Sequence, residues 1–319
     1  MKINDKTVIG KSNLEVFADT LSELALVNRN VYAVTSDSRV SGKLIPYAEN
    51  FPEQIIEVGI AEQNLVGIAA GLASTGKIVF AVSPSSFLTT RALEQIKNDV
   101  AYSDFPVNLI GISAGVSYGA LGSTHHSLHD VAVLRAIHNI VIVVPADNFE
   151  TELAIRAAVQ SDKPFFIKFG KKPVLHLHKI NDEFKIGKAS VITDGNDVAF
   201  IACGETVAPA FEAAQILFRE GISSRLISMH TIKPLDNNVI IQAALDCKVI
   251  ITVEEHSIFG GLGEACATVL MEAGMHVPFR RIGIPDEDTV TGSQQDIFTH
   301  YGISAEGLCN LARVLLKKH

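Results

Sequence analysis

Short runs of apolar, β-branched residues alternate with segments whose apolar residues recur at helical spacing, almost from one end of the chain to the other. In the first half, the apolar runs predict strands at residues 31–35, 54–58, 78–82, 107–113, 140–144 and 165–169. The intervening segments predict helices, among them 61–74, 89–102 and 148–160. The runs are continuously apolar, as in parallel strands that are covered by helices on both faces. The pattern therefore predicts a doubly wound α/β domain.

The same alternation resumes in the second half of the chain, after a looser, charged stretch that contains Gly and Pro. It predicts strands at 198–202, 224–228, 249–253 and 279–284, helices near 207–220 and 263–272, and two closing helices. We therefore expect two doubly wound domains, at residues 1–172 and 197–319, joined by a linker at 173–196.

Composition narrows the class of protein. The chain has 319 residues, of which 47% are hydrophobic and 19% charged, so it can bury large cores. Its formal net charge of −8 argues against general nucleic-acid binding, which needs basic patches. No apolar run reaches the ~18–20 residues that span a bilayer, so we expect no membrane insertion.

Two further features bear on the cellular compartment. The sequence begins MKINDKTVIGKSN, which has no apolar segment like the core of a secretory signal. The four cysteines are far apart and form no CxxC pair, so we expect reduced thiols. Both observations predict a cytoplasmic protein.

The most informative segment is 57–73, which reads EVGIAEQNLVGIAAGLA. A predicted strand ends, Gly59 makes a turn, and Glu62 lies in the first turn of a helix rich in small residues. A carboxylate there can simply complement the positive end of the helix dipole. Gly67 and Gly71 can simply allow close helix packing.

The string VGIAEQN followed by AAGLA resembles the pyrimidine-binding domain of the transketolase family, which includes deoxyxylulose-phosphate synthase. The resemblance implies that the cofactor is thiamine diphosphate and that Glu62 hydrogen-bonds its aminopyrimidine ring. A carboxyl group on the ring nitrogen favours the tautomer whose exocyclic nitrogen can accept a proton from the thiazolium carbon.

Segment 85–95, SSFLTTRALEQ, is similar to the family segment in which an aromatic residue precedes RAxEQ. The resemblance implies that Phe87 stacks on the aminopyrimidine and that Arg91 belongs to the cofactor site. Read alone, Phe87 is equally a core residue at a strand-to-helix turn.

Segment 119–130, GALGSTHHSLHD, contains a Thr-His pair that resembles the THQ signature of the family. The resemblance implies that His125 lies near the reacting carbonyl, where it can assist proton transfer and hold a developing oxyanion. His125 and His129 could also share a helix face and bind zinc. The sequence has neither an HExxH glutamate nor a Cys pair beside them, so we expect no metal site.

Five further residues fall where the family contacts its cofactor and substrate. Asp37 lies at the position of a turn near the thiazolium ring, and Arg39 and Ser41 lie where relatives bind a substrate phosphate. Lys168 and Lys171 occupy positions at which relatives have arginines. A solvated loop and a lysine-rich linker would also account for these five residues.

Segment 253–264, VEEHSIFGGLGE, resembles the C-terminal domain of the same family. Its GLG triplet is not a dinucleotide fingerprint, because Cys266 replaces the third glycine and the strand comes late in the chain. Full-length transketolases hold the diphosphate through Mg²⁺ in another domain, marked by a GDG motif. No GDG occurs in the 319 residues.

The resemblance therefore implies the C-terminal subunit of a split transketolase. It implies an N-terminal partner chain that carries the diphosphate-binding domain and Mg²⁺, with thiamine diphosphate shared between the subunits. Self-association into a dimer or a dimer of heterodimers is expected.

The substrate segment departs from the classical transketolase pattern at three positions. Leu121 replaces an acidic residue, Ser113 replaces an active-site histidine of the family, and His126 replaces the glutamine of the THQ signature. Leu121 cannot accept a hydrogen bond from a sugar hydroxyl, which puts the standard ketose phosphates in doubt. We expect transfer of a two-carbon ketol unit between sugars. The alternatives are a deoxyxylulose-phosphate-synthase-like or 2-oxoacid dehydrogenase beta-chain reaction, which begins with decarboxylation, and a non-catalytic subunit.

Overall fold

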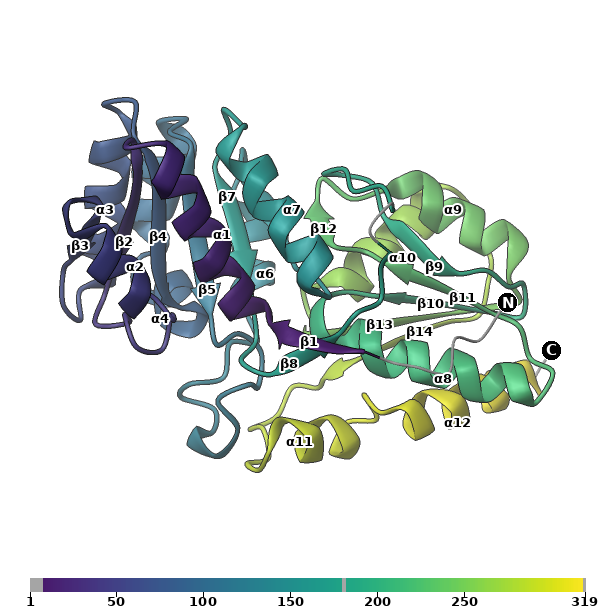
Figure 1. The fold of residues 1–319 in the computed structure, drawn as a ribbon. Coiled ribbons are helices and arrows are strands. Elements are labelled where there is room, and N and C mark those ends of the chain that lie inside the picture. The colour runs from purple at the N-terminus through teal and green to yellow at the C-terminus, as the bar shows by residue number, and fades with distance from the viewer. Residues whose placement is uncertain (1–7, 180–181, 318–319) are drawn as a thin grey trace.

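The computed structural model describes residues 8–179 and 182–317, which form two α/β units side by side (Figure 1). Residues 1–7 and 318–319 of the two predicted domains lie outside the described part. In Figure 1 the purple-to-teal unit holds the first sheet and the green-to-yellow unit holds the second.

The first sheet has seven strands in the order β12-β6-β7-β5-β4-β2-β3. All neighbours pair in parallel except β12, which runs antiparallel to β6. The strands are β2 (Val31–Thr35), β3 (Ile55–Glu57), β4 (Ile78–Pro84), β5 (Val107–Ile112), β6 (Val141–Val143), β7 (Phe165–Lys168) and β12 (Thr231–Lys233).

Helices cover both faces of this sheet. One face packs against α1 (Asn13–Val27) and α7 (Asn148–Val159), and α2 (Ile45–Asn50) lies beside them. The other face packs against α3 (Glu62–Ala73), α4 (Ser85–Arg91), α5 (Leu93–Gln95), α6 (Asp130–Ala136) and a π-helical turn at Ile96–Tyr102. Short 3-10 turns lie at Pro52–Gln54 and Gly119–Leu121. The doubly wound arrangement explains why the predicted strands are continuously apolar.

The second sheet has five strands in the order β14-β13-β10-β11-β9, parallel except for β9. The strands are β9 (Ser190–Thr193), β10 (Val198–Ala202), β11 (Ser224–Ser228), β13 (Val249–Ser257) and β14 (Phe279–Ile284). The helices are α8 (Val207–Arg219), α9 (Asn237–Asp246), α10 (Leu262–Glu272), α11 (Gln294–His300) and α12 (Ala305–Leu316), with a 3-10 turn at Gly204–Thr206. The predicted fold class, two doubly wound α/β domains, is confirmed.

Three strands do not follow the predicted division of the chain into two domains and a linker. Within the predicted linker, β8 (Pro173–Leu175) pairs antiparallel with β1 (Ile9–Ser12), and β9 forms an edge of the second sheet. Strand β12 follows the second sheet's β11 in the chain but joins the first sheet. These three short strands are not among those that the sequence predicts. The domain limits stay a prediction.

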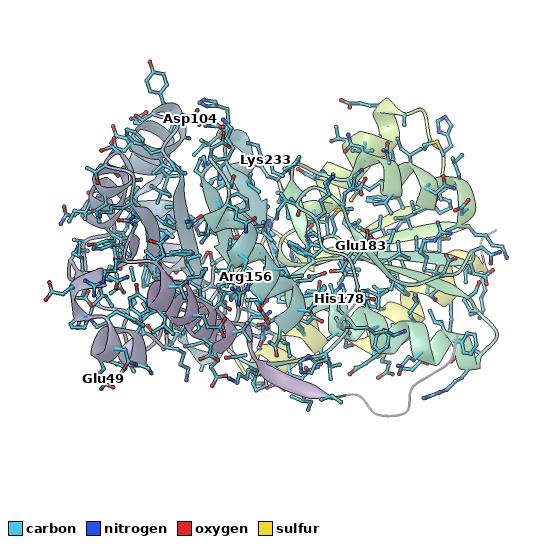
Figure 2. The ribbon with its side chains drawn as sticks, turned by 45° about the horizontal axis from the view of Figure 1, so that its top comes forward. Glu49, Asp104, Arg156, His178, Glu183 and Lys233 are labelled. Atoms are coloured by element: carbon cyan, nitrogen blue, oxygen red, sulfur yellow. The ribbon has the colours of Figure 1, made fainter. Side chains whose placement is uncertain are left out.

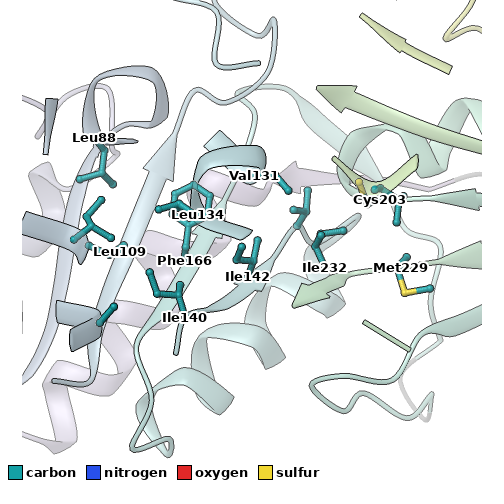
Figure 3. Close-up of a cluster of buried hydrophobic side chains, with 14 of the residues drawn as sticks. Leu88, Leu109, Val131, Leu134, Ile140, Ile142, Phe166, Cys203, Met229 and Ile232 are labelled. Carbon is teal, nitrogen blue, oxygen red and sulfur yellow. The ribbon is translucent and has the colours of Figure 1, made fainter. Parts of the chain in front are cut away.

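The two units share a continuous hydrophobic core. Figure 3 shows Val131 and Ile142 of the first unit beside Ile232, with Cys203 and Met229, which directly follow β10 and β11 of the second sheet, further along the same cluster. All five side chains are buried. The junction between the units is therefore part of the protein interior, and polar groups that lie there must find partners within the chain.

The segment predicted as one helix over 89–102 is divided in the structure. Helix α4 begins at Ser85, directly after Pro84, and ends at Arg91, before α5 and the π-helical turn. Proline suits the start of a helix because its nitrogen has no hydrogen to leave unpaired. The early start places Phe87 and Arg91 four residues apart on one helix, where side chains are neighbours.

Candidate active site

The candidate residues gather where strands of the first sheet end. Asp37 follows β2, Glu62 opens α3 just after β3, and Phe87 and Arg91 lie on α4, which follows β4. Ligands of open parallel sheets bind outside the carboxyl ends of the strands. The topology therefore brings together segments that are separate in the sequence.

Glu62, Arg91 and Phe87 form one contiguous group. The Glu62 side chain is 3% exposed, and its Oε2 accepts a hydrogen bond from Arg91 Nη1 at 3.0 Å. The Arg91 guanidinium lies 4.4 Å from the centroid of the Phe87 ring, a cation–π distance. A cleft of about 720 Å³, lined by Ile60 to Asn64 and by Arg91, opens beside the Glu62 carboxylate.

His125 also contacts the Phe87 ring. The two ring centroids are 5.4 Å apart and the planes meet at 70°, an edge-to-face contact. Tyr118 makes a second such contact with His125 at 5.3 Å, and Lys171 Nζ lies 4.2 Å from the centroid of the Tyr118 ring. Thr124 Oγ1 lies 3.0 Å from His125 Nδ1.

These contacts define a row of six side chains, which we call the active-site row: Glu62, Arg91, Phe87, His125, Tyr118 and Lys171. Five of its members come from the sequence prediction, and the structure brings all five together. The row leads from a buried carboxylate, past two aromatic rings and an imidazole, to an exposed ammonium group. Burial lowers the pKa of Lys171.

Asp37, Arg39 and Ser41 lie in the loop after β2 and are organised by a residue that the sequence did not single out. Glu57, at the end of β3, accepts a hydrogen bond from the Asp37 amide and lies 3.2 Å from Arg39 Nε. Ser41 Oγ donates to the Ser38 carbonyl at 3.4 Å. Asp37 has a φ of 52°, in the left-handed region that Asp tolerates better than most residues.

Lys168 lies in a different environment from Lys171. Its side chain is 6% exposed, and Nζ lies 2.9 Å from Oδ1 of the fully buried Asp130. Burial opposes the charge on Lys168, but the Asp130 carboxylate outweighs it and raises the Lys168 pKa. The ammonium group thus has a carboxylate partner already, and a substrate role for Lys168 stays an untested prediction.

Asp130 is the centre of a buried network. Its Oδ2 accepts hydrogen bonds from Ser85 Oγ at 2.7 Å and Ser127 Oγ at 2.8 Å, in addition to the ion pair with Lys168. Burial disfavours the charged form, yet Lys168 and these donors lower the pKa of Asp130 to about 2. The network joins the start of α4, which carries Phe87, to the end of the loop that carries His125.

Two of the residues that depart from the family pattern, Ser113 and Leu121, lie in the segment between β5 and α6 that also carries His125. Ser113 directly follows β5, is fully buried and has a φ of 53°. Leu121 is 56% exposed in the loop that carries His125. An exposed apolar side chain therefore stands where the family has an acidic group.

Sequence reasoning missed Glu57, Tyr118 and Asp130. Glu57 had a usable signal, because a carboxylate at the end of a predicted parallel strand lies at the ligand-binding edge of the sheet. Tyr118 and Asp130 had none, since their partners come from distant segments. Among residues 8–179 and 182–317, no group of three or more His, Cys, Asp or Glu side chains could hold a metal ion.

The comparisons with known proteins identify the family of the chain. Residues 11–174 match the family model of the transketolase pyrimidine-binding domain, and residues 187–308 match that of the transketolase C-terminal domain. The fold and the paired domains thus define the C-terminal half of a transketolase-type transferase. The chain belongs to the transketolase family.

Its relatives include separate subunits of split enzymes. The chain is 46% identical over 303 residues to one subunit of the apulose-4-phosphate transketolase of Phocaeicola vulgatus, covering 95% of this chain and 96% of that one. It is 32% identical over 304 residues to a 6-deoxy-6-sulfo-D-fructose transketolase subunit of a Clostridium species, with 95% and 94% covered. A solved split-gene transketolase, described as an inactive β4 tetramer, superposes with a TM-score of 0.88 at 32% identity, covering 97% and 99%. The predicted split-subunit resemblance is confirmed.

Proposed function

We propose that this chain is the C-terminal subunit of a thiamine-diphosphate-dependent transketolase that transfers a two-carbon ketol unit between sugars with an anionic end. The observation that carries the proposal is the active-site row, in which the buried Glu62, the Phe87 ring and His125 are contiguous. Three motifs from separate segments thus supply, one after another along the row, the carboxyl group for the pyrimidine ring, the aromatic ring that would stack on it and the imidazole for the substrate carbonyl.

The residues present fit one half of the cofactor. A buried carboxyl, an aromatic ring and an open cleft beside them suit an aminopyrimidine. When bound, thiamine diphosphate supplies carbanion chemistry that protein side chains lack. Glu62 would hold a proton at the pyrimidine ring nitrogen, Arg91 would orient the Glu62 carboxyl, Phe87 would stack on the ring, and Asp37 would lie near the thiazolium.

The diphosphate half needs oxygen ligands on Mg²⁺ and donors on the phosphates. The described residues supply no metal-binding cluster, so we assign both to an N-terminal partner subunit that shares the cofactor. Ile60, 75% exposed at the edge of the cleft, fits a surface that the partner covers. We propose a dimer or a dimer of heterodimers as the active assembly.

His125 would move a proton at the substrate carbonyl and stabilise the developing oxyanion. Its ring is held between the edges of Phe87 and Tyr118, and Thr124 Oγ1 contacts Nδ1, which leaves Nε2 as the nitrogen for substrate. Positioning of this kind lowers the barrier because the reacting groups need not be reoriented.

Arg39, Ser41 and Lys171 would bind the anionic end of the sugar. The two relatives are named for a phosphorylated and a sulfonated sugar, and fixed positive charge suits both anions. The exposed Leu121 offers no acceptor to a sugar hydroxyl, so we expect a substrate that does not depend on that hydrogen bond.

A cytoplasmic location remains our proposal. All four cysteines are buried free thiols, as expected in a reducing compartment. No helix within the described residues is long and apolar enough to cross a membrane.

The test is reconstitution. The purified chain is mixed with a GDG-containing diphosphate-domain chain, thiamine diphosphate and Mg²⁺, and ketol transfer from a phosphorylated ketose to an aldose is measured. We expect activity only when both chains are present. Release of carbon dioxide from pyruvate would instead support a deoxyxylulose-phosphate-synthase-like or dehydrogenase beta-chain reaction. Calorimetric cofactor binding without turnover of any sugar pair would support a non-catalytic subunit.

A further inference from the structure

The loop that carries His125, residues 113–129, lies between the two units of the molecule. It belongs to the first unit by sequence, but several of its hydrogen bonds go to residues of the second. We call residues 113–129 the His125 loop. Its contacts with the second unit occur at its base, at its tip and at its end.

At the base, Glu255 on β13 accepts a hydrogen bond from the Val116 amide at 2.8 Å through Oε1. The same carboxyl packs directly on Gly115, where a Cβ would lie 2.2 Å from Glu255 Cδ. Gly115 also has a φ of 60°, which favours glycine. The loop backbone and the Glu255 carboxyl are therefore fitted to each other.

The Glu255 carboxyl is itself held in place. Gln294 Nε2, at the start of α11, donates to Glu255 Oε1 at 2.9 Å and to Glu205 Oε2 at 2.7 Å. Burial and the neighbouring Glu205 raise the pKa of Glu255 to about 8. A protonated Glu255 can accept the loop amide without placing a second negative charge beside Glu205.

At the tip, Thr289 is the contact from the second unit. Its Oγ1 lies 2.7 Å from His126 Nδ1 and 3.1 Å from Ser123 Oγ. The other ring nitrogen of His126 lies 3.0 Å from the Gly119 carbonyl, inside the loop. The imidazole adjacent to His125 is thus fixed at both nitrogens.

At the end of the loop, the Ser257 amide donates to the Leu128 carbonyl at 3.0 Å. We propose that the second unit positions His125 and that Glu255 and Thr289 are positioning residues, acting on the reaction only through the His125 loop. Their catalytic importance rests on the proposed function, whereas their effect on the order of the loop does not.

Hydrogen exchange of the purified full chain tests the positioning directly. The variants are Glu255→Ala, Glu255→Gln and Thr289→Val, with the exposed Glu212→Gln and Thr268→Val as matched controls. We expect amides of residues 113–129 to exchange about tenfold faster in Glu255→Ala and about threefold faster in Thr289→Val, while peptides of β2 and β4 are unchanged. Glu255→Gln should restore protection, because the amide oxygen still accepts from Val116. Unchanged exchange of the loop in both Glu255→Ala and Thr289→Val would overturn the proposal.

Kinetics of the reconstituted enzyme supply the second measurement. Glu255→Ala should lower kcat about tenfold with the KM for thiamine diphosphate unchanged, and Glu255→Gln should recover kcat. If Glu255→Ala does not fold, the decision falls to Thr289→Val, whose loss is a single hydroxyl group. If the unmodified chain shows no ketol transfer with its partner, the proposed function fails, and hydrogen exchange still decides whether the second unit orders the loop.

Discussion

The active-site row and the network around Asp130 each contain a buried carboxylate, but the two carboxylates have different partners. Glu62 has an ion pair with an arginine whose side chain is 48% exposed, and a cleft opens beside it. Asp130 accepts hydrogen bonds from Lys168, Ser85 and Ser127, all supplied by the interior of the chain. The Asp130 carboxylate is satisfied entirely within the chain, whereas the Glu62 carboxylate borders an open cleft.

The difference separates function from stability. A carboxylate that the chain fully satisfies can be removed only by leaving its partners unpaired, so its loss should weaken the fold. A carboxylate at an open cleft can be removed with less structural cost, so its loss should mainly affect chemistry. Four substitutions test this contrast.

Glu62→Ala should have the largest effect on the reaction. We expect kcat of the reconstituted enzyme to fall by about 10²–10⁴-fold, the range for loss of a general acid–base group, with a nearly unchanged melting temperature. Glu94→Ala, an exposed carboxylate nearby, is the control. An unimpaired Glu62→Ala enzyme would contradict the proposed chemistry.

Asp130→Ala should have the largest effect on stability. It leaves the buried Lys168 ammonium without its partner, so the free energy of unfolding should fall by about 3–5 kcal/mol in chemical denaturation. The double variant Asp130→Leu with Lys168→Met should recover most of this loss, because apolar residues replace both charges. A loss of unfolding free energy no greater than in the exposed control Asp162→Ala would mean that the Asp130 network does not stabilise the fold.

Lys171→Ala tests the exposed end of the row. We expect the KM for a phosphorylated sugar to rise about 10–100-fold, as for the loss of a charged hydrogen bond, with kcat little changed. The KM for the same sugar without phosphate should not move. Lys97→Ala, exposed on the π-helical turn, is the control, and equal effects on both sugars would rule out a contact with the anionic end.

The pH dependence of stability tests the junction at Glu255. Its pKa is raised from an ordinary value of 4.5 to about 8, so its stabilising contribution is fully present below pH 4.5 and is lost as the pH rises towards 8. Relative to Glu255→Gln, the unmodified chain should lose up to about 1.4 kcal/mol of unfolding free energy per pH unit in this interval. If the unfolding free energies of the two proteins changed with pH in parallel, the proton that is bound between pH 4.5 and pH 8 would not depend on Glu255.

A second buried group at the junction also titrates. The effect of pH on stability must therefore be measured as a difference between the unmodified chain and Glu255→Gln. His178 lies at the centre of the molecule (Figure 2) and contacts Asp147 Oδ2 at 3.0 Å and Glu150 Oε1 at 3.3 Å. Burial opposes its charge, but the two carboxylates outweigh burial and raise the His178 pKa. Its contribution is therefore also lost at higher pH, and the comparison with Glu255→Gln separates it from the contribution of the Glu205–Glu255 pair.

Much of the fold and of the row follows from local patterns. Continuous apolar runs predict the parallel strands, and the motifs at 57–73 and 85–95 single out Glu62, Phe87 and Arg91 through their resemblance to the transketolase family. The strand β12 escapes the pattern because it contains a single apolar residue, Ile232, although the strand extends the first sheet. The local pattern does not predict the environment of Lys168 either. A lysine at the end of β7 could bind substrate or could form half of a buried ion pair.

The sequence by itself determined the main parallel strands, most of the helices, the α/β fold class and the family to which the chain belongs, because each depends on residues close together in the chain. Only the tertiary structure decided which polar groups meet. Glu255 and the Val116 amide are 139 residues apart, and Thr289 and His126 are 163 apart. Contacts at such separations depend on how the two sheets pack, which no local spacing of residues encodes.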